Sequence, residues 1–132
     1  MKYVLDTHAL LWALFKPEAL SRGVRGIIED VRNEVNVSAV SFWEISLKYS
    51  LGKLELQGAV PEDIPEAARE SGMQIMELDV DVVSSSYRLI ATKHRDPFDR
   101  LIVWHCIKAG HILLTKDPEM KLYERAGLRH RW

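Results

Sequence analysis

Residues 1–15 read MKYVLDTHALLWALF, and this stretch decides the fold class. The apolar run Tyr3-Val4-Leu5 has the length of a buried strand, Asp6 ends it, and Thr7 to Phe15 has the apolar spacing of a helix. The same succession, a short apolar run and then a longer amphipathic one, recurs along the chain. Such alternation predicts an α/β fold with a mostly parallel central sheet and helices on both of its faces.

Apolar periodicity and capping residues place the other elements. Strands are expected at 35–38, 74–76, 111–114 and 128–130. Helices are expected at 21–32, 41–51, 61–72, 80–91 and 97–109, and a short helix should begin at Pro118. The chain shows no repeat and no linker-like segment, so a single domain over residues 1–132 is expected.

The overall composition sets broad limits on function. A formal net charge of −1 does not indicate a nucleic-acid binder, which usually has a basic face. No apolar run approaches the roughly 18 residues of a membrane span, and an acid at position 6 interrupts any signal-peptide core. We therefore expect a cytoplasmic protein without membrane association. Cys106 is the single cysteine, and its apolar helical surroundings favour a packing role.

Four acids occupy comparable places in the predicted fold. Asp6 directly follows the first strand, and Asp117 comes three residues after Leu114, the end of another. Glu44 and Asp99 fall in the first turn of the helices expected at 41–51 and 97–109. Because the carboxyl ends of parallel strands share one edge of a sheet, where ligands of open α/β sheets bind, the fold should bring these acids together.

Taken singly, each of these acids is better explained by helix capping than by metal binding. Residues 41–44 (SFWE) match a capping box, and Asp96-Pro97 and Asp117-Pro118 each pair a cap residue with a proline at the first helical position. Four carboxylates at one edge would repel one another, however, and a bound divalent cation removes that conflict. Mg²⁺ or Mn²⁺ prefers oxygen ligands, so together the four acids predict a metal site.

Other chemistries find little support in the sequence. The histidines lack the HExxH spacing of zinc hydrolases, and no glycine-rich phosphate loop is present. Residues 84–86 (SSS) lack the context of a nucleophile elbow and are expected on a helix surface.

Four ordered motifs carry a resemblance to a known family. LDTHALLW (5–12), VSAVSFWEI (37–45), HRDPFDRLI (94–102) and LLTKD (113–117) closely resemble the motifs of PIN-domain ribonucleases, above all those of VapC-type toxins of toxin–antitoxin pairs. The likeness covers nearly the whole chain, with its motifs in order. His105 and Cys106 depart from it, standing where relatives often carry smaller residues.

This resemblance implies a three-layer α/β fold, dependence on Mg²⁺ or Mn²⁺, RNA cleavage, a homodimer and a neutralising antitoxin. It carries the family's acidic quartet onto Asp6, Glu44, Asp99 and Asp117. Asp96 is additional and is assigned to helix capping or to the surroundings of the metal, and Thr115 matches a hydroxyl position near the fourth acid.

The predicted reaction is hydrolysis of an RNA phosphodiester by a metal-activated water. Asp6, Asp99 and Asp117 are expected to hold the cation, and Glu44 to complete the site. The aromatic residues Trp12, Trp43 and Trp104 are expected to pack in helices, with base stacking as the alternative. Two short basic clusters, residues 93–95 (KHR) and 129–131 (RHR), each indicate a solvated surface when taken alone. Contacts with the RNA phosphates are the alternative for Lys93, Arg95, Arg129 and Arg131.

The expected partners follow from the net charge. A near-neutral chain with an acidic pocket gains a continuous basic rim by forming a homodimer, through apolar helix faces near the N-terminal half. An antitoxin is expected to place an Arg or Lys in the carboxylate cluster.

Four alternatives stay open at this stage. One is a PIN-like RNA-processing nuclease without an antitoxin, and another is a member of the same fold that binds RNA without cutting it. An aspartate-nucleophile phosphatase would need a second Asp where His8 stands. A phospho-receiver module would need two adjacent acids after the first strand, where Asp6 stands alone.

Overall fold

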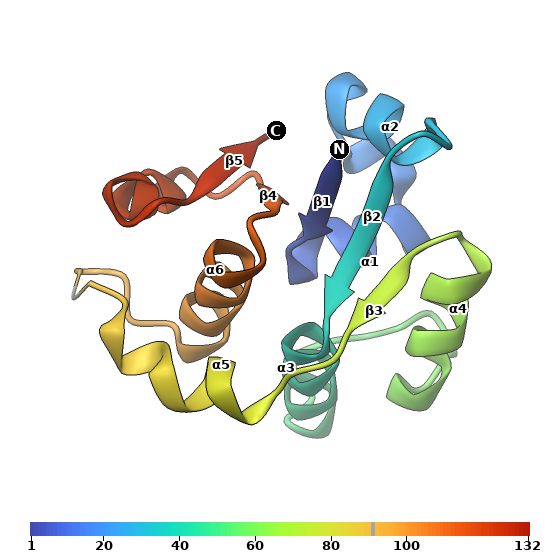
Figure 1. Cartoon of the computed structure of the whole chain (residues 1–132). Coiled ribbons are helices and arrows are strands. Elements are labelled where there is room, and N and C mark those ends of the chain that lie inside the picture. Colours follow the sequence, from blue (N-terminus) through green and yellow to red (C-terminus); the bar gives the residue numbers. More distant parts are fainter. Residues whose placement is uncertain (91) are drawn as a thin grey trace.

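The computed structural model describes residues 1–90 and 92–132, and within them one five-stranded sheet, wholly parallel, organises the fold (Figure 1). Its strand order is β3-β2-β1-β4-β5. The strands are β1 (Lys2–Leu5), β2 (Glu34–Ser38), β3 (Gln74–Met76), β4 (Ile112–Leu114) and β5 (Arg129–Arg131). The prediction of a mostly parallel sheet is confirmed.

Helices cover both faces of this sheet, which gives three layers (Figure 1). One face is covered by α1 (Thr7–Phe15), α2 (Arg22–Glu29) and α4 (Ile64–Glu70), and the other by α6 (Pro97–Ala109) and the 3₁₀ helix η4 (Pro118–Ala126). The remaining helical segments are α3 (Ala39–Ser50), α5 (Val80–Ser85), η1 (Pro17–Ala19), η2 (Pro61–Asp63) and η3 (Ser86–Arg88).

The central strand β1 shows how the sequence builds two cores. Tyr3 and Leu5 pack into the core under α1, α2 and α4, whereas Val4 packs into the core under α6 and η4. Because both faces of β1 are covered, its sequence is a continuous apolar run and not an alternating one. Cys106 is fully buried in the second core, and burial raises the pKa of its thiol, so the predicted packing role is confirmed.

Local capping signals fix several helix starts. Asp6, Asp96 and Asp117 are the N-caps of α1, α6 and η4, as their positions in the sequence predict. Gly110 takes a left-handed conformation (φ 72°) and ends α6.

Helix α3 begins earlier than expected. Its N-cap is Ser38, whose Oγ accepts from the Val40 N–H (3.2 Å), so the capping box at 41–44 is wrong. Ser41 lies inside the helix, where its Oγ accepts a hydrogen bond from Thr7 (3.0 Å). Glu44 consequently lies in the second turn of α3 instead of the first.

Two other helices end sooner than expected. The helix expected at 80–91 becomes α5 and the tighter η3, and residue 91 lies outside the described residues. Ser85 and Ser86 donate to the carbonyls of Asp81 (2.6 Å) and Val83 (2.7 Å), a pattern that competes with a regular helix. Helix α2 ends at Glu29 and not at residue 32.

The strand order determines where a ligand can bind. Successive strands step from β1 to β2 to β3 on one side, and β4 and β5 lie on the other, so the order reverses between β1 and β4. The crevice outside the carboxyl ends of strands at such a switch point is the usual binding site of an open α/β sheet. Asp6 follows β1 there, and its N–H donates to the Leu114 carbonyl of β4 (3.1 Å).

Among the described helices, none has both the length and the apolar character that crossing a membrane requires.

Candidate active site

Buried polar side chains gather at the carboxyl edge of the sheet. Asn36, in the middle of β2, is the exception, with its amide donating to the Tyr3 carbonyl (3.1 Å). The others follow β1, β2 or β4, or lie on α6 and the loop before it: Asp6, Thr7, Ser38, Ser41, Glu44, His94, His105 and Thr115. Burying a polar group is costly unless it has a hydrogen-bond partner, so the concentration of such groups marks this edge as the candidate functional site.

Asp6 combines helix capping with a buried charge. Its Oδ1 accepts from the Ala9 N–H (2.8 Å). Burial raises the pKa of Asp6, and the Glu44 charge adds to the rise, whereas hydrogen bonds from Thr115 and Ala9 oppose it. The carboxyl group therefore binds a proton more tightly than an exposed aspartate does.

Glu44 is the most deeply buried acid of the predicted quartet, with 2% of its surface exposed. Its Oε2 accepts a hydrogen bond from Lys48 Nζ, one turn further along α3. Burial acts to lower the pKa of Lys48, but the hydrogen bond and charge of Glu44 outweigh it and raise that pKa. Within residues 1–90 and 92–132, Glu44 Oε1 is the one buried side-chain oxygen or nitrogen without a hydrogen-bond partner.

Asp99 lies in the first turn of α6, as predicted, beside the N-cap Asp96. Asp96 Oδ1 accepts from the N–H groups of Phe98 (2.9 Å) and Asp99 (3.1 Å), which supports its predicted capping role. Burial raises the pKa of Asp99 to about 6, with further increases from the Asp96 and Glu44 charges. Its Oδ2 lies 3.1 Å from His94 Nε2.

Asp117 and Thr115 follow β4 on the other side of the switch point. The Asp117 N–H donates to Thr115 Oγ1 (3.1 Å), and Asp117 Oδ1 accepts from the Glu119 N–H (2.9 Å). Because Thr115 also contributes a hydrogen bond that opposes the pKa rise of Asp6, its hydroxyl links the first and fourth predicted acids.

The four predicted acids lie at the same edge of the sheet, but no three of them have ligand atoms within 4.8 Å of one another. The Glu44 charge acts on both Asp6 and Asp99. Asp6 and Asp117 line one cavity of about 450 Å³, together with His8, Trp12 and Lys116. In the part of the chain that the structure describes, one group of three His, Cys, Asp or Glu residues has its ligand atoms within 4.8 Å of one another. Asp117 is the one member of this group that belongs to the quartet.

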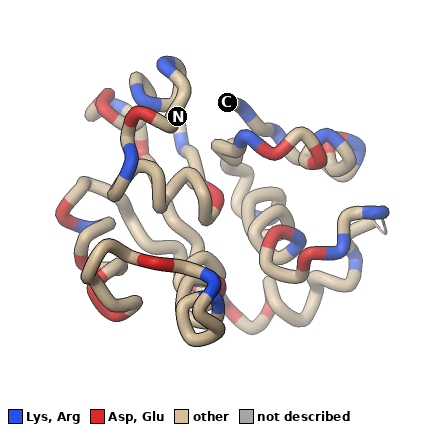
Figure 2. The backbone as a smooth tube through the Cα atoms, turned by 180° about the vertical axis from the view of Figure 1, so that it is seen from behind, with Lys and Arg blue, Asp and Glu red and all other residues tan. Residues whose placement is uncertain are grey.

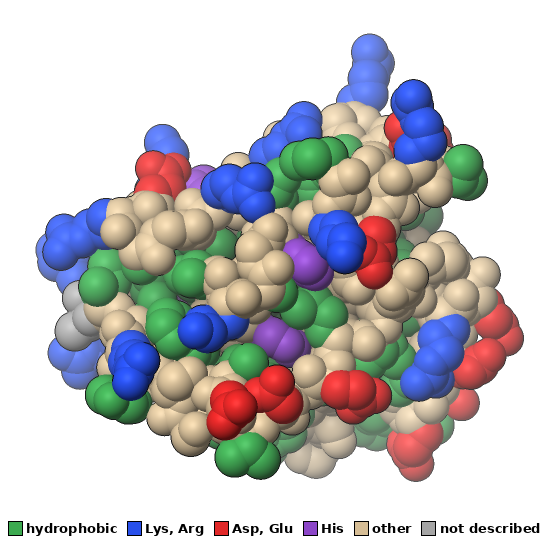
Figure 3. Space-filling view, in the orientation of Figure 1, with side chains coloured by type: hydrophobic (Ala, Val, Ile, Leu, Met, Phe, Trp, Pro, Cys, Tyr) green, Lys and Arg blue, Asp and Glu red, His purple; other side chains and the backbone are tan. Residues whose placement is uncertain are grey.

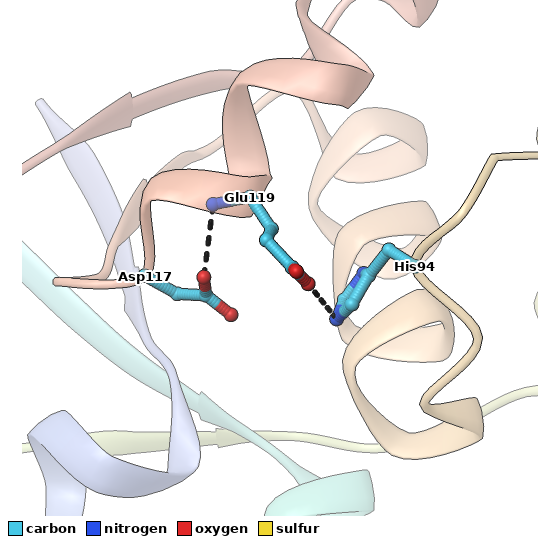
Figure 4. Close-up of side chains that lie close together, drawn as sticks. All are labelled: His94, Asp117 and Glu119. Atoms are coloured by element: carbon cyan, nitrogen blue, oxygen red, sulfur yellow. Dashed lines mark hydrogen bonds and ion pairs between the residues drawn. The ribbon is translucent and has the colours of Figure 1, made fainter.

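That tight group consists of His94, Asp117 and Glu119, which point toward a common space between η4 and the start of α6 (Figure 4). Sequence reasoning missed it. His94 was expected with Lys93 and Arg95 on a solvated surface, but it is buried, with 7% of its surface exposed, while its two neighbours are exposed. The only local hint was that His94 begins the HRDPFDRLI motif.

The residues at this edge fit a divalent cation of the Mg²⁺ type. The donors are carboxylate oxygens, two of the acids have raised pKa values, and one buried oxygen of Glu44 lacks a partner. Burial is the main cause of those raised pKa values, and the neighbouring carboxylate charges add to it. A cation bound among the acids would offset both effects.

The surroundings of the acids are mixed in charge. Lys and Arg positions are spread over the molecule instead of forming one basic face (Figure 2). On one face, most basic side chains lie toward the upper and left parts, and most acids lie along the lower and right edges (Figure 3). Lys93, Arg95, Arg129 and Arg131 are exposed and available for contacts.

The tryptophans differ from one another. Trp12 and Trp104 are partly buried, and the Trp104 indole donates to Ser85 Oγ (3.0 Å), as expected for packing. Trp43 packs edge to face on Phe98 of α6, as expected, although 55% of its surface stays exposed. Among the residues that depart from the family, His105 hydrogen-bonds to Ser38 through Nδ1 (2.9 Å), and burial lowers its pKa.

Taken together, the fold and the site define an α/β protein with a candidate acidic metal centre at the switch point of a parallel sheet. Residues 3–126 match the profile of the family described as "PIN domain", and the chain belongs to that family. The resemblance predicted from the four sequence motifs is confirmed.

Individual proteins that this chain resembles in sequence or in fold are VapC ribonucleases or VapBC complexes. Ribonuclease VapC22 of Mycobacterium tuberculosis is 28% identical over 123 residues, which cover 89% of this chain and 88% of that protein. Ribonuclease VapC16 of the same organism is 38% identical over 55 residues, but this match spans only 42% of this chain and 39% of VapC16. The crystal structure of DNA-bound VapBC from Salmonella typhimurium contains a chain that matches this one with a TM-score of 0.68 and 17% sequence identity. The match covers 99% of this chain and 97% of that chain, and it shows a similar fold.

Proposed function

We propose that this chain hydrolyses RNA at the carboxylate cluster of Asp6, Glu44, Asp99 and Asp117 with Mg²⁺ or Mn²⁺ bound there. The class of activity follows from the family and the relatives: the chain is a VapC-like PIN ribonuclease, the toxin of a VapBC-type pair. The observation that supports this site is geometric: Asp6 and Asp117 line one cavity at the switch point, and Glu44 at the same edge has a buried oxygen without a hydrogen-bond partner.

The side chains have distinct tasks in this proposal. A cation held here supplies the positive charge that stabilises the phosphate and activates water. Asp6 and Asp117, on either side of the switch point, line the cavity where a phosphodiester can enter. Glu44, with one free oxygen, can accept a proton or orient a water at the base of the cluster. The Thr115 hydroxyl positions Asp6 and Asp117 relative to each other, because it donates to the Asp6 side chain and accepts from the Asp117 N–H.

The RNA path is inferred from the cavity that Asp6 and Asp117 line. Trp12 and His8 form an aromatic wall of this cavity, and Lys116 lies over the Trp12 ring (5.8 Å). An unpaired base can stack on Trp12 while Lys116 contacts the adjacent phosphate. Lys93, Arg95 and Arg131 lie exposed further out and extend the phosphate contacts.

The partners are also part of the proposal. Exposed apolar side chains on α3 and α5, among them Trp43, Leu47, Val80 and Val83, favour a homodimer through this face. Lys48 already neutralises one oxygen of Glu44 from inside the chain. An antitoxin Arg or Lys would do the same for the remaining carboxylates, and so compete with the cation.

The structure gives the phospho-receiver alternative no support. That fold has the strand order 2-1-3-4-5, whereas the order here is 3-2-1-4-5. An RNA-processing nuclease without an antitoxin would share this site, and the two differ only in the partner. Co-expression with the neighbouring small reading frame separates them, since relief of growth arrest by that frame is expected only for a toxin.

The decisive test is cleavage of a labelled single-stranded RNA by the full chain in Mg²⁺, in Mn²⁺ and in EDTA. Cleavage should require the ion and stop in EDTA. Saturating Mg²⁺ should also raise the melting temperature, because a ligand that binds only the native state stabilises it. Full activity in EDTA would refute the proposed chemistry. A Glu70→Gln variant, altered at an exposed carboxylate on α4, controls for loss of charge alone.

A further inference from the structure

His94 holds a position that neither helix capping nor the acidic quartet explains. It is buried, yet its Nε2 lies 3.1 Å from Asp99 Oδ2 and 3.7 Å from Glu119 Oε2. The ligand atoms of His94, Asp117 and Glu119 lie within 4.8 Å of one another. Figure 4 shows the imidazole edge and both carboxylates turned toward the same space.

The 3.7 Å between His94 Nε2 and Glu119 Oε2 lies within the span of one ion's coordination shell, and the 4.8 Å limit of the whole group slightly exceeds that span. Ligands bonded to an octahedral ion at about 2.1 Å are about 3.0 Å apart when adjacent and about 4.2 Å apart when opposite. Asp117 uses Oδ1 to cap η4, which leaves its Oδ2 free to face the group. Glu119 is 58% exposed and has ample room in solvent, but its carboxylate turns toward His94.

The second ring nitrogen of His94 is held as in metal-binding histidines. Its Nδ1 lies 2.8 Å from the Tyr123 hydroxyl, which Arg100 Nη1 also contacts (3.3 Å). A ligating histidine usually donates its other N–H to a fixed acceptor, and the fully buried Tyr123 is one.

This network serves two tautomers without moving heavy atoms. In one, the Tyr123 hydroxyl donates to Nδ1 and the Nε2–H donates to Asp99. In the other, Nδ1–H donates to Tyr123, whose own proton goes to the His94 carbonyl (3.3 Å). The second tautomer leaves the Nε2 lone pair facing carboxylates, an arrangement that needs a cation between them.

We infer that His94, Asp117 and Glu119 form a second divalent-cation site, distinguished from the carboxylate quartet by its nitrogen ligand. An imidazole among carboxylates favours first-row transition ions such as Mn²⁺ over Mg²⁺. The inference rests on the proposed function only in that both sites share Asp117. It makes the choice between Mn²⁺ and Mg²⁺ depend on His94 and Glu119, two side chains outside the quartet.

The test is Mn²⁺ binding by the full chain, followed by electron paramagnetic resonance. Titration counts the bound ions, and pulsed spectra report ¹⁴N coupling from a histidine ligand. Wild type should show ¹⁴N-coupled Mn²⁺. Glu119→Gln should weaken that site at least about tenfold, and His94→Gln should abolish the coupling.

Glu124→Gln is the matched control. Glu124 lies on the same helix η4, is similarly exposed and pairs with another histidine, His130 (2.8 Å). Its substitution should leave the ¹⁴N signal unchanged. Absence of ¹⁴N coupling in wild type, or equal binding by Glu119→Gln, would overturn the inference and leave His94–Glu119 a simple ion pair. Glu119→Gln decides the matter even if the buried His94→Gln fails to fold.

Failure of this site can be told apart from failure of the proposed function. Asp6→Asn should lose RNA cleavage and keep the ¹⁴N-coupled Mn²⁺. Cleavage by a wild type without the coupling would refute the second site alone. Coupling in a chain that cleaves no RNA would refute the proposed function alone.

Discussion

Two sets of buried polar side chains lie side by side at the carboxyl edge of the sheet, and they behave differently. The neutral set is paired: Thr7 with Ser41 (3.0 Å) and Ser38 with His105 (2.9 Å). The carboxylate set is only partly paired. Asp6 and Asp99 have raised pKa values despite their hydrogen bonds, and one oxygen of Glu44 has no partner. Paired neutral groups stabilise a fold, whereas crowded carboxylates weaken it unless something binds them.

This contrast predicts that the neutral set serves the stability of the fold and that the carboxylate set serves the reaction. Substitutions in the neutral set should lower the free energy of unfolding and spare the activity of the folded enzyme. Substitutions in the carboxylate set should do the reverse.

The largest effect is expected from Asp99→Asn. Asparagine keeps the shape of the side chain and removes the charge, and Asp96 still caps α6. RNA cleavage in Mg²⁺ should fall by at least about 10²-fold, the scale of losing one group that stabilises transition-state charge. In EDTA the melting temperature should stay the same or rise, because a repelled charge is gone. A variant that cleaves normally would remove Asp99 from the site.

The pH dependence of stability gives the next effect. The pKa of Asp99 is about 6 when folded, against 3.8 as the ordinary value, so the folded chain binds its proton more tightly. The stability of the metal-free protein should therefore fall as the pH rises from about 4 to about 6, by on the order of 2 kcal/mol for this group. Above that window the loss is complete.

Thermal unfolding in EDTA across this pH range, compared with Asp99→Asn, isolates the contribution of Asp99. Saturating Mg²⁺ should stabilise wild type more at the upper end of the range, where the carboxylates are charged. Parallel curves for the two proteins would mean that folding does not raise the pKa of Asp99.

The sequence predicts the positions that depend on local signals and misses those that depend on distant contacts. Asp6, Asp96 and Asp117 are N-caps as expected, because capping involves neighbours two or three residues away. The quartet itself stays a prediction. The burial of His94 depends on Tyr123, which lies 29 residues further along the chain, and no local pattern reports it.

The start of α3 illustrates the same limit. Ser38 and Ser41 are both acceptable N-caps, and the choice between them depends on contacts with His105 and Thr7, which are 67 and 34 residues away. With Ser38 as the N-cap, Glu44 lies in the second turn of α3 instead of the first. Its ion pair with Lys48 follows from their spacing of four residues on the helix.

Ser38→Ala tests the neutral set. The substitution removes the N-cap of α3, worth about 1 kcal/mol, and leaves the buried His105 nitrogen without its partner. The free energy of unfolding should drop by about 1 to 3 kcal/mol, with cleavage by the folded protein preserved. Ser46→Ala, at an exposed position of the same helix, should change neither. Loss of cleavage without loss of stability in Ser38→Ala would move Ser38 into the catalytic machinery.

The smallest effect is expected from Asp96→Asn, three residues from the position with the largest. Asparagine caps a helix about as well as aspartate, so stability should change by only a few tenths of a kcal/mol. The Asp96 charge is one cause of the raised pKa of Asp99, and its removal should lower that pKa. The acid limb of the cleavage profile should then shift to lower pH, with activity at neutral pH retained. If Asp96→Asn were inactive while Asp99→Asn still cleaved RNA, the two roles would have to be exchanged. Asp96 would then be the metal ligand, and Asp99 would not belong to the carboxylate set.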